Sequence, residues 1–264
     1  MKRTILLFWA VLLLVSPVLA AVPGQSQVLL RATEDGYPGA CRDVGLGSYT
    51  ADTLRQAAGT DFAFLPTGLL GLNLQTGPVD DDALSLSFPV DEAIYVVSLT
   101  APDLKALLEQ AAAPLSLNES EQLDRDASTW DGFLQLSGLH AIYDVSSLPG
   151  QKLYELKLDD ATEPDLTDET LVFTAAVPAS LLDGTYGYPV RTPEREVGSL
   201  RALVAERITA EGIDTEPDDD RIILYGAYEN NIIDSFPPLL IVLVILLFVI
   251  FGGHKWRRSL NFER

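Results

Sequence analysis

The chain has 264 residues, of which 38 are acidic and 18 basic, giving a formal net charge of −20. So acidic a surface repels the phosphates of nucleic acids and anionic lipids, which excludes nucleic-acid binding as a function. The single cysteine, Cys41, excludes an intrachain disulfide and leaves two alternatives, burial as a small hydrophobe or an intermolecular bond.

The N-terminus has the three parts of a signal peptide, predicted here as residues 1–20. A charged start at Lys2-Arg3 precedes the apolar run Ile5–Val15, and small residues follow up to a cleavage point after Ala20. An uncleaved signal anchor is the alternative. Residues 21–39 form an N-terminal extension that contains one β-prone run, Val28–Ala32.

The first half of the exported part predicts helices and strands in mixed order. Ser48 is the expected cap of a helix that ends at Gly59, and Thr100 is the expected cap of a helix through Ala113. The predicted strands are Asp61–Leu65, the alternating run Leu84–Phe88, and Ala93–Leu99.

The second half begins with a polar, acidic stretch, Leu115–Asp131, that predicts an exposed loop. The following elements are the strand pair Phe133–Tyr143 and Lys152–Leu158, the strand Leu171–Ala176, an amphipathic helix capped by Ser199, and the strand Arg221–Tyr225. Because strands and helices mix without strict alternation, we expect an α+β fold of layered mixed sheets and helices.

The C-terminus predicts one transmembrane helix. After a stalk at 226–235, residues 236–253 hold no charge, and 18 helical residues span roughly 27 Å, close to the hydrocarbon thickness of a bilayer. The cluster His254–Arg258 then places the tail, 254–264, in the cytoplasm. We therefore expect a single-pass cell-membrane protein whose bulk is extracytoplasmic, with a buried C-terminal helix as the alternative.

Several motifs do not indicate a catalytic or metal-binding site. The runs Asp80–Asp82 and Asp218–Asp220 lack the spacing of a calcium loop and are interpreted as solvated faces. Ser137 lacks the Gly-x-Ser-x-Gly context of a nucleophile, and His140 alone cannot build a metal site. Asn118 begins a glycosylation sequon that matters only in a eukaryotic secretory pathway. We predict no metal, no cofactor and no catalytic residue.

Residues 40–225 resemble the C-terminal, substrate-binding domain of the 5'-nucleotidase/UDP-sugar hydrolase family. The resemblance rests on the order and spacing of four segments, which are Gly45–Arg55, Phe64–Gly77, Phe88–Glu109 and Phe133–Asp144 followed by Leu181–Tyr188. In that family a separate N-terminal domain holds two metal ions and performs the hydrolysis. No segment of this sequence resembles that domain.

The resemblance also implies where a substrate would bind, and most of those positions differ here. The family's loop arginine aligns with Gly71, its two base-stacking phenylalanines with Val90 and Val177, and an asparagine with Glu92. Asp183 matches the aspartate that meets ribose hydroxyls, with a turn-forming role as the alternative. Arg42 is the remaining weak candidate, near another family arginine.

These features predict a membrane-anchored, non-catalytic binding or interaction module for an exported partner, of which a metallophosphoesterase is one candidate, with nucleotide binding doubtful. The first alternative is the recognition half of a split 5'-nucleotidase in nucleotide catabolism. The second alternative is a membrane-proximal structural scaffold.

Overall fold

The computed structural model describes residues 24–34, 37–38, 41–217 and 220–226. The predicted signal peptide, transmembrane helix and cytoplasmic tail lie outside these ranges. Within them, no helix has both the length and the apolar composition needed to cross a bilayer.

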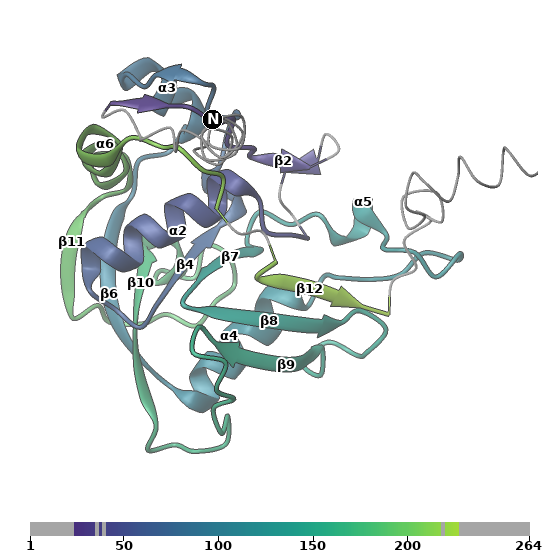
Figure 1. Cartoon of the computed structure of the whole chain (residues 1–264). Coiled ribbons are helices and arrows are strands. Elements are labelled where there is room, and N and C mark those ends of the chain that lie inside the picture. Colours follow the sequence, from purple (N-terminus) through teal and green to yellow (C-terminus); the bar gives the residue numbers. More distant parts are fainter. Residues whose placement is uncertain (1–23, 35–36, 39–40, 218–219, 227–264) are drawn as a thin grey trace, which may run out of the picture.

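A five-stranded mixed sheet forms the centre of the molecule, with the strand order β11-β6-β10-β4-β7 (Figure 1). The strands are β4 (Phe62–Pro66), β6 (Ala93–Thr100), β7 (Leu134–Ser137), β10 (Val172–Pro178) and β11 (Arg195–Ser199). β4 and β10 are parallel, and the other neighbours are antiparallel. The carboxyl ends of β4 and β10 therefore reach the same edge of the sheet.

A three-stranded sheet, in the order β12-β8-β9, forms a second layer. Its strands are β8 (Leu139–Asp144), β9 (Leu153–Leu158) and β12 (Ile222–Tyr225), and β12 runs parallel to β8. Four very short strands make two further ribbons, β1 (Gln25–Ser26) with β5 (Gly77–Pro78) and β2 (Thr33–Glu34) with β3 (Tyr37–Pro38).

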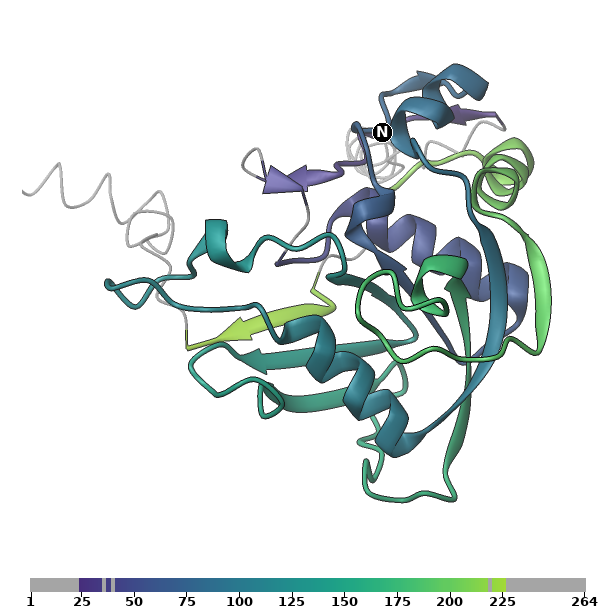
Figure 2. The same cartoon turned by 180° about the vertical axis from the view of Figure 1, so that it is seen from behind.

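Helices cover the central sheet on both faces. α2 (Gly45–Ala58) and α6 (Leu200–Glu211) cover one face, and α4 (Ala101–Ala112) covers the other. The structure also has the short helices α3 (Asp81–Ser87) and α5 (Arg125–Ser128), and single 3₁₀ turns at Thr67–Leu69 (η1) and Ala179–Leu181 (η2). α2 lies in front of the sheet in Figure 1, and α4 lies in front of β8 and β9 in Figure 2. The predicted α+β fold of layered mixed sheets and helices is confirmed.

The two faces of the central sheet belong to two different hydrophobic clusters, and β4 shows how one strand serves both. Phe62 and Phe64 pack with α4 and the three-stranded sheet, whereas Ala63 and Leu65 pack with α2 and α6. Because side chains alternate along a strand, burial on both faces requires an apolar run rather than alternation. This is why the run at 61–65 predicted a buried strand correctly.

Capping residues fix two of the long helices as predicted. Thr100 accepts a hydrogen bond from the backbone N–H of Asp103, and the carboxylate of Asp103 accepts one from the N–H of Thr100, which makes a capping box at the start of α4. Ser199 accepts from the N–H of Ala202 at the start of α6.

The expected cap of α2 is wrong, because the helix begins three residues before Ser48. Val44 occupies the N-cap position, and its N–H donates to the side chain of Gln135 on β7. A Cβ at Gly47 would lie 2.4 Å from that same side chain. The glycine therefore permits the close approach of α2 and β7, and the helix begins before its predicted start. Gly59 ends the helix in the left-handed conformation, as predicted.

The predicted strand Leu84–Phe88 is also wrong and is part of helix α3. Asp80 caps this helix by accepting from the N–H of Ala83, and two further acids lie in its first turn. Leu84 and Phe88 are buried while Leu86 is 58% exposed, which is the spacing of a helix face. The acidic run is thus explained by helix capping and the helix dipole.

Two smaller predictions need correction, and one strand had no prediction. Val28–Ala32 is not a strand, because within it only Leu30 forms an isolated bridge, to Leu74. The stretch 115–131 is not simply an exposed loop, since Leu115 and Ser128 are buried and α5 lies within it. β11 was not predicted from its polar sequence. Cys41 is buried in the core, as the first of its two alternatives expected.

An ion pair joins the layers at one point. The guanidinium of Arg221, just before β12, donates two hydrogen bonds of 2.8 Å to the carboxylate of Asp52 on α2 and one to the carbonyl of Leu136 on β7. Ser137 Oγ donates to the same carboxylate at 2.6 Å. Burial alone would raise the pKa of Asp52, but the hydrogen bonds from Arg221 and Ser137 outweigh burial, and the pKa is lowered.

We predict that Arg221→Met lowers the free energy of unfolding of the 21–235 fragment by about 2–4 kcal/mol at pH 7, because it leaves a half-buried carboxylate without its cation. A depressed folded-state pKa stabilises the fold above the unfolded value of about 3.9 and loses that effect as the pH falls through the folded value. Urea unfolding of wild type and variant should therefore show a difference that shrinks below about pH 4. A difference that persists undiminished in strong acid would show that Asp52 is not the partner that matters.

Candidate functional site

The sheet edge at the carboxyl ends of β4 and β10 gathers most of the positions that the sequence singled out. Gly71 follows β4, Val177 and Asp183 lie at and after the end of β10, and Glu92 precedes β6. Since β6 runs antiparallel to β10, its start also reaches this edge. We call this the β4–β10 edge. The structure thus brings four of the six candidate positions to one edge, and Val90 lies two residues before Glu92.

Gly71 has no space for a side chain. A Cβ there would lie 2.4 Å from the carbonyl oxygen of Leu86 and 2.8 Å from the ring of Pro89. The N–H of Gly71 donates to the carbonyl of Ser87 at 2.8 Å, which holds the loop against the end of α3. An arginine at this position would require the backbone of α3 to move.

The two valines that align with stacking rings have different surroundings. Val177 is 1% exposed and packs in the hydrophobic cluster shared by α4 and the central sheet. Val90 is 48% exposed, in the segment between α3 and β6. Of these two, Val90 alone is therefore available to contact another molecule, and an isopropyl group offers no aromatic face.

Glu92 and Asp183 are both used by the fold. The carboxylate of Glu92 accepts the N–H of Ser180 at 2.9 Å, which links the start of β6 to the turn after β10. The carboxylate of Asp183 accepts the N–H of Thr185 at 2.8 Å and also its hydroxyl. These two bonds from Thr185 lower the pKa of Asp183. The carboxylate closes a turn before Gly184, which favours the turn-forming alternative.

Two residues of this edge were missed by the sequence analysis. Tyr186 is partly buried, and burial raises the pKa of its hydroxyl, an effect to which the charges of Glu92, Asp131 and Asp183 add. Asp131 lies beside Gly68, where a Cβ would meet both its side chain and the hydroxyl of Tyr186 at 2.8 Å. The charges of three carboxylates therefore act on one phenol, and no local motif indicates the approach of Glu92 and Asp131, which are distant from Tyr186 in the sequence.

Large apolar side chains are exposed on the segments of this edge. Leu72 follows Gly71 and is 61% exposed, and its N–H donates to the carbonyl of Leu86 on α3. Val190 is exposed on the loop after β10, with a methyl group near Gly184. Together with Leu86 and Val90, these residues give the acidic edge an apolar border.

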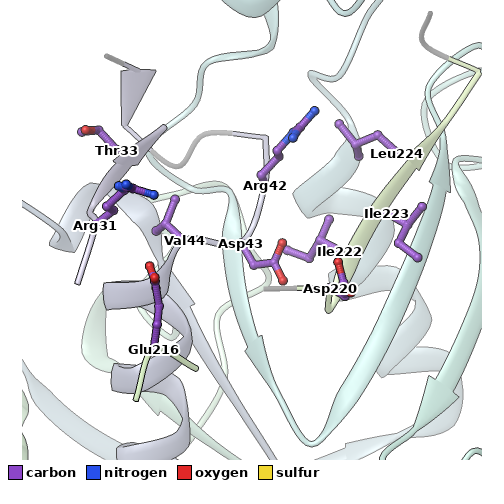
Figure 3. A pocket seen from close by; sticks show the side chains of 11 residues that line it. Arg31, Thr33, Arg42, Asp43, Val44, Glu216, Asp220, Ile222, Ile223 and Leu224 are labelled. Carbon is purple, nitrogen blue, oxygen red and sulfur yellow. The ribbon is translucent and has the colours of Figure 1, made fainter. Parts of the chain in front are cut away.

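Arg42 is not at the β4–β10 edge. It lines a hollow of about 350 Å³ between β12 and the start of α2, together with Arg31, Asp43 and Glu216 (Figure 3). Asp43 is engaged in the fold, because its carboxylate accepts the N–H of Arg221 at 2.6 Å. With Asp220, three carboxylates and two arginines line this hollow, so its charges largely compensate one another.

The remaining polar candidates have structural partners. Ser137 donates to Asp52, and His140 lies 3.9 Å from Asp159 and 3.5 Å from the carbonyl of Asp220. In the part of the chain that the structure describes, no group of three or more His, Cys, Asp or Glu side chains is arranged to hold a metal ion. The run Asp218–Asp220 lies partly outside that part.

We predict that Gly71→Ala lowers the free energy of unfolding by about 1–3 kcal/mol, because the added methyl group meets backbone rather than a flexible side chain. Gly198→Ala is the matched control, since its Cβ would meet only the side chain of Leu203 at 3.3 Å or more. Urea unfolding of both variants of the 21–235 fragment measures the difference. Equal stability of the two variants would contradict the tight packing at position 71.

Comparisons with known proteins agree with the fold. The family described as 5'-nucleotidase, C-terminal domain, matches residues 22–192. No curated protein sequence matches the chain.

Solved structures give the same result at low identity. The 5'-nucleotidase precursor of Thermus thermophilus is 18% identical, with a TM-score of 0.64 over 86% of this chain and 43% of its own. The NAD nucleotidase of Haemophilus influenzae is 15% identical, with a TM-score of 0.57 over 80% of this chain and 37% of its own. The chain thus spans about two fifths of the length of these structures. By its sequence match and its fold, the chain belongs to the 5'-nucleotidase C-terminal domain family.

Proposed function

We propose that this domain is a non-catalytic binding or interaction module, held on the outer side of a membrane, that contacts an exported protein partner through the β4–β10 edge. The observation that carries this proposal is the state of the family's ligand positions. Gly71 has no room for a side chain, Val177 is in the core, and the carboxylates of Glu92 and Asp183 bind backbone N–H groups. Each of these four positions serves the fold of this chain.

Electrostatics supports the same proposal. Glu92, Asp131 and Asp183 place three carboxylates around Tyr186, in a chain whose net charge is −20. A phosphate brought to this edge would meet like charge without a compensating arginine at Gly71. A basic side chain of a partner would meet complementary charge.

The apolar border supports a protein partner rather than a small ligand. Leu72, Leu86, Val90 and Val190 are between 48% and 75% exposed. Exposed apolar side chains can supply the burial that gives a protein contact its affinity, and the carboxylates beside them can select a partner of complementary charge. Anchoring by residues 236–253 would confine the module and its partner to one membrane surface.

A second function is favoured by one observation. The matched region covers only 43% of the Thermus thermophilus 5'-nucleotidase precursor. A separate exported metallophosphoesterase could supply a hydrolytic half, which would make this chain the recognition half of a split 5'-nucleotidase. That function requires nucleotide binding at the β4–β10 edge, whereas the interaction module does not.

The proposal is tested by affinity capture of the full chain from detergent extract, followed by mass spectrometry. The test variant is Leu72→Asp with Val90→Asp, and the control is Val172→Asp, which is 54% exposed at the start of β10. A partner captured by wild type and control but lost with the test variant would support the proposal. Equal capture by all three proteins would exclude the β4–β10 edge as the contact surface.

We also predict that the 21–235 fragment does not hydrolyse AMP, UDP-glucose or p-nitrophenyl phosphate when divalent metal is added, because hydrolysis of this kind needs several convergent metal ligands. Release of phosphate or nitrophenol is the measurement. Metal-dependent turnover that persists through a second, independent purification would contradict the non-catalytic assignment.

A further inference from the structure

The three-stranded sheet has one covered face and one open face. Tyr143, Leu156 and Ile222 point into the core, where α4 packs against them (Figure 2). The opposite face of β8, β9 and β12 is turned to the viewer in Figure 1, and no other described element crosses it there. An open sheet face is normally polar, so its side chains indicate whether something else contacts it.

The open face carries polar side chains, such as His140 and Lys157, but also an apolar and aromatic group. Tyr154 on β9 and Tyr225 on β12 are 69% and 64% exposed, and their rings stack with centroids 6.0 Å apart and an interplanar angle of 22°. Ile223, 49% exposed, lies two residues before Tyr225 on the same face and pairs with Ile142 of β8. These four residues form a strip, which we call the tyrosine strip.

The loop between β8 and β9 extends this strip. Its tip carries Leu148, which is 70% exposed. The buried ammonium of Lys152 donates to the carbonyls of Val145 and Ser147 at 2.9 and 2.8 Å, which fixes the loop. The N–H of Val145 donates to the carbonyl of Tyr225 at 3.0 Å, so the loop tip and the end of β12 lie at the same end of the sheet.

The carboxylates of this region are compensated locally. Asp144 accepts hydrogen bonds from Ser146 and Ser147, which keep it ionised, and the ammonium of Lys152 offsets its charge. Glu155 pairs with Lys157. The strip is therefore less acidic in effect than the composition of the chain suggests.

The sequence limits how far this end can lie from a membrane. Gly226 follows Tyr225, and nine residues, 227–235, separate it from the uncharged run 236–253. Nine fully extended residues span at most roughly 30 Å. If residues 236–253 are embedded, Tyr225 lies within roughly 30 Å of the bilayer surface, which puts the tyrosine strip within reach of the lipid. This step rests on the membrane anchoring in the proposed function.

We propose that the tyrosine strip and Leu148 contact the lipid headgroup region of the bilayer in which the chain is anchored. Tyrosine suits this region because its ring is apolar and its hydroxyl is wet, and an exposed leucine at a loop tip can enter the acyl boundary. Zwitterionic lipids fit best, since the acidic chain is repelled by anionic headgroups. The contact would fix the orientation of the domain and so the direction in which the β4–β10 edge faces.

The test uses the full chain in phosphatidylcholine vesicles, with a nitrobenzoxadiazole label on Leu148→Cys. The matched control is Leu72→Cys, which is 61% exposed and hydrogen-bonded to α3, a helix that lies far from β9 in Figure 1. The unsubstituted chain controls for labelling of the buried Cys41. Flotation with the vesicles reports anchoring, and spin-labelled lipid and iodide report the surroundings of the label.

At position 148 we expect blue-shifted emission, quenching by headgroup-level spin-labelled lipid and protection from iodide, whereas position 72 shows none of these. Adding Tyr154→Ser and Tyr225→Ser should reduce the shift, because it removes the aromatic part of the contact. Both side chains are exposed, so their loss leaves the core intact. A chain that floats while position 148 stays open to iodide would overturn the inference alone. A chain that does not float would overturn the anchoring and the inference together. The label at position 148 could instead be protected from iodide but not quenched by spin-labelled lipid, with a protection that increases with protein density. That result would overturn the lipid contact and assign the strip to a second copy of the chain.

Discussion

Burial of the central sheet on both faces is the constraint on which the rest of the structure depends. Each of its middle strands must supply apolar side chains to the α2–α6 side and to the α4 side at once, as Phe64 and Leu65 do in β4. A shift of such a strand by one residue would move each of its side chains to the opposite face of the sheet. Arg221 then links the start of β12 in the second sheet to Asp52 on α2 and to the carbonyl of Leu136 on β7 of the first.

The same arrangement creates the candidate site and also fills it. The parallel pair β4 and β10 brings two loops to one edge, which also holds four of the six candidate positions taken from the family resemblance. In this chain that edge is closed by contacts of its own, since α3 packs against Gly71 and the carboxylate of Glu92 holds Ser180. The outcome is a surface with three carboxylates and an apolar border. This surface is the basis of the proposal that the edge binds a protein and not an anion.

Much of this could be predicted from the sequence, and the failures have local causes. Buried runs such as 61–65 and strong caps such as Thr100 act through neighbouring residues, so they were identified correctly. The strand prediction for Leu84–Phe88 is wrong because the alternation Leu84-Ser85-Leu86 is short. The cap at Asp80 and packing against the core both favour the helix. The predicted start of α2 is wrong because the helix approaches β7 at Gly47, and this contact involves Gln135, which is distant in the sequence. The gathering of Asp131 and Tyr186 depends on tertiary structure in the same way.

The central claim is that the β4–β10 edge is not a nucleotide site. Relative to a family member with an arginine and two stacking rings, the absence of a charged hydrogen bond costs about 1.5–3 kcal/mol and each lost stacking face about 1–3 kcal/mol, which is enough to turn micromolar affinity into millimolar. Calorimetric titration of the 21–235 fragment with AMP, ATP and adenosine measures this directly. The account predicts no binding heat up to about a millimolar. Micromolar binding that Asp183→Ala abolishes would contradict it and would favour the split 5'-nucleotidase.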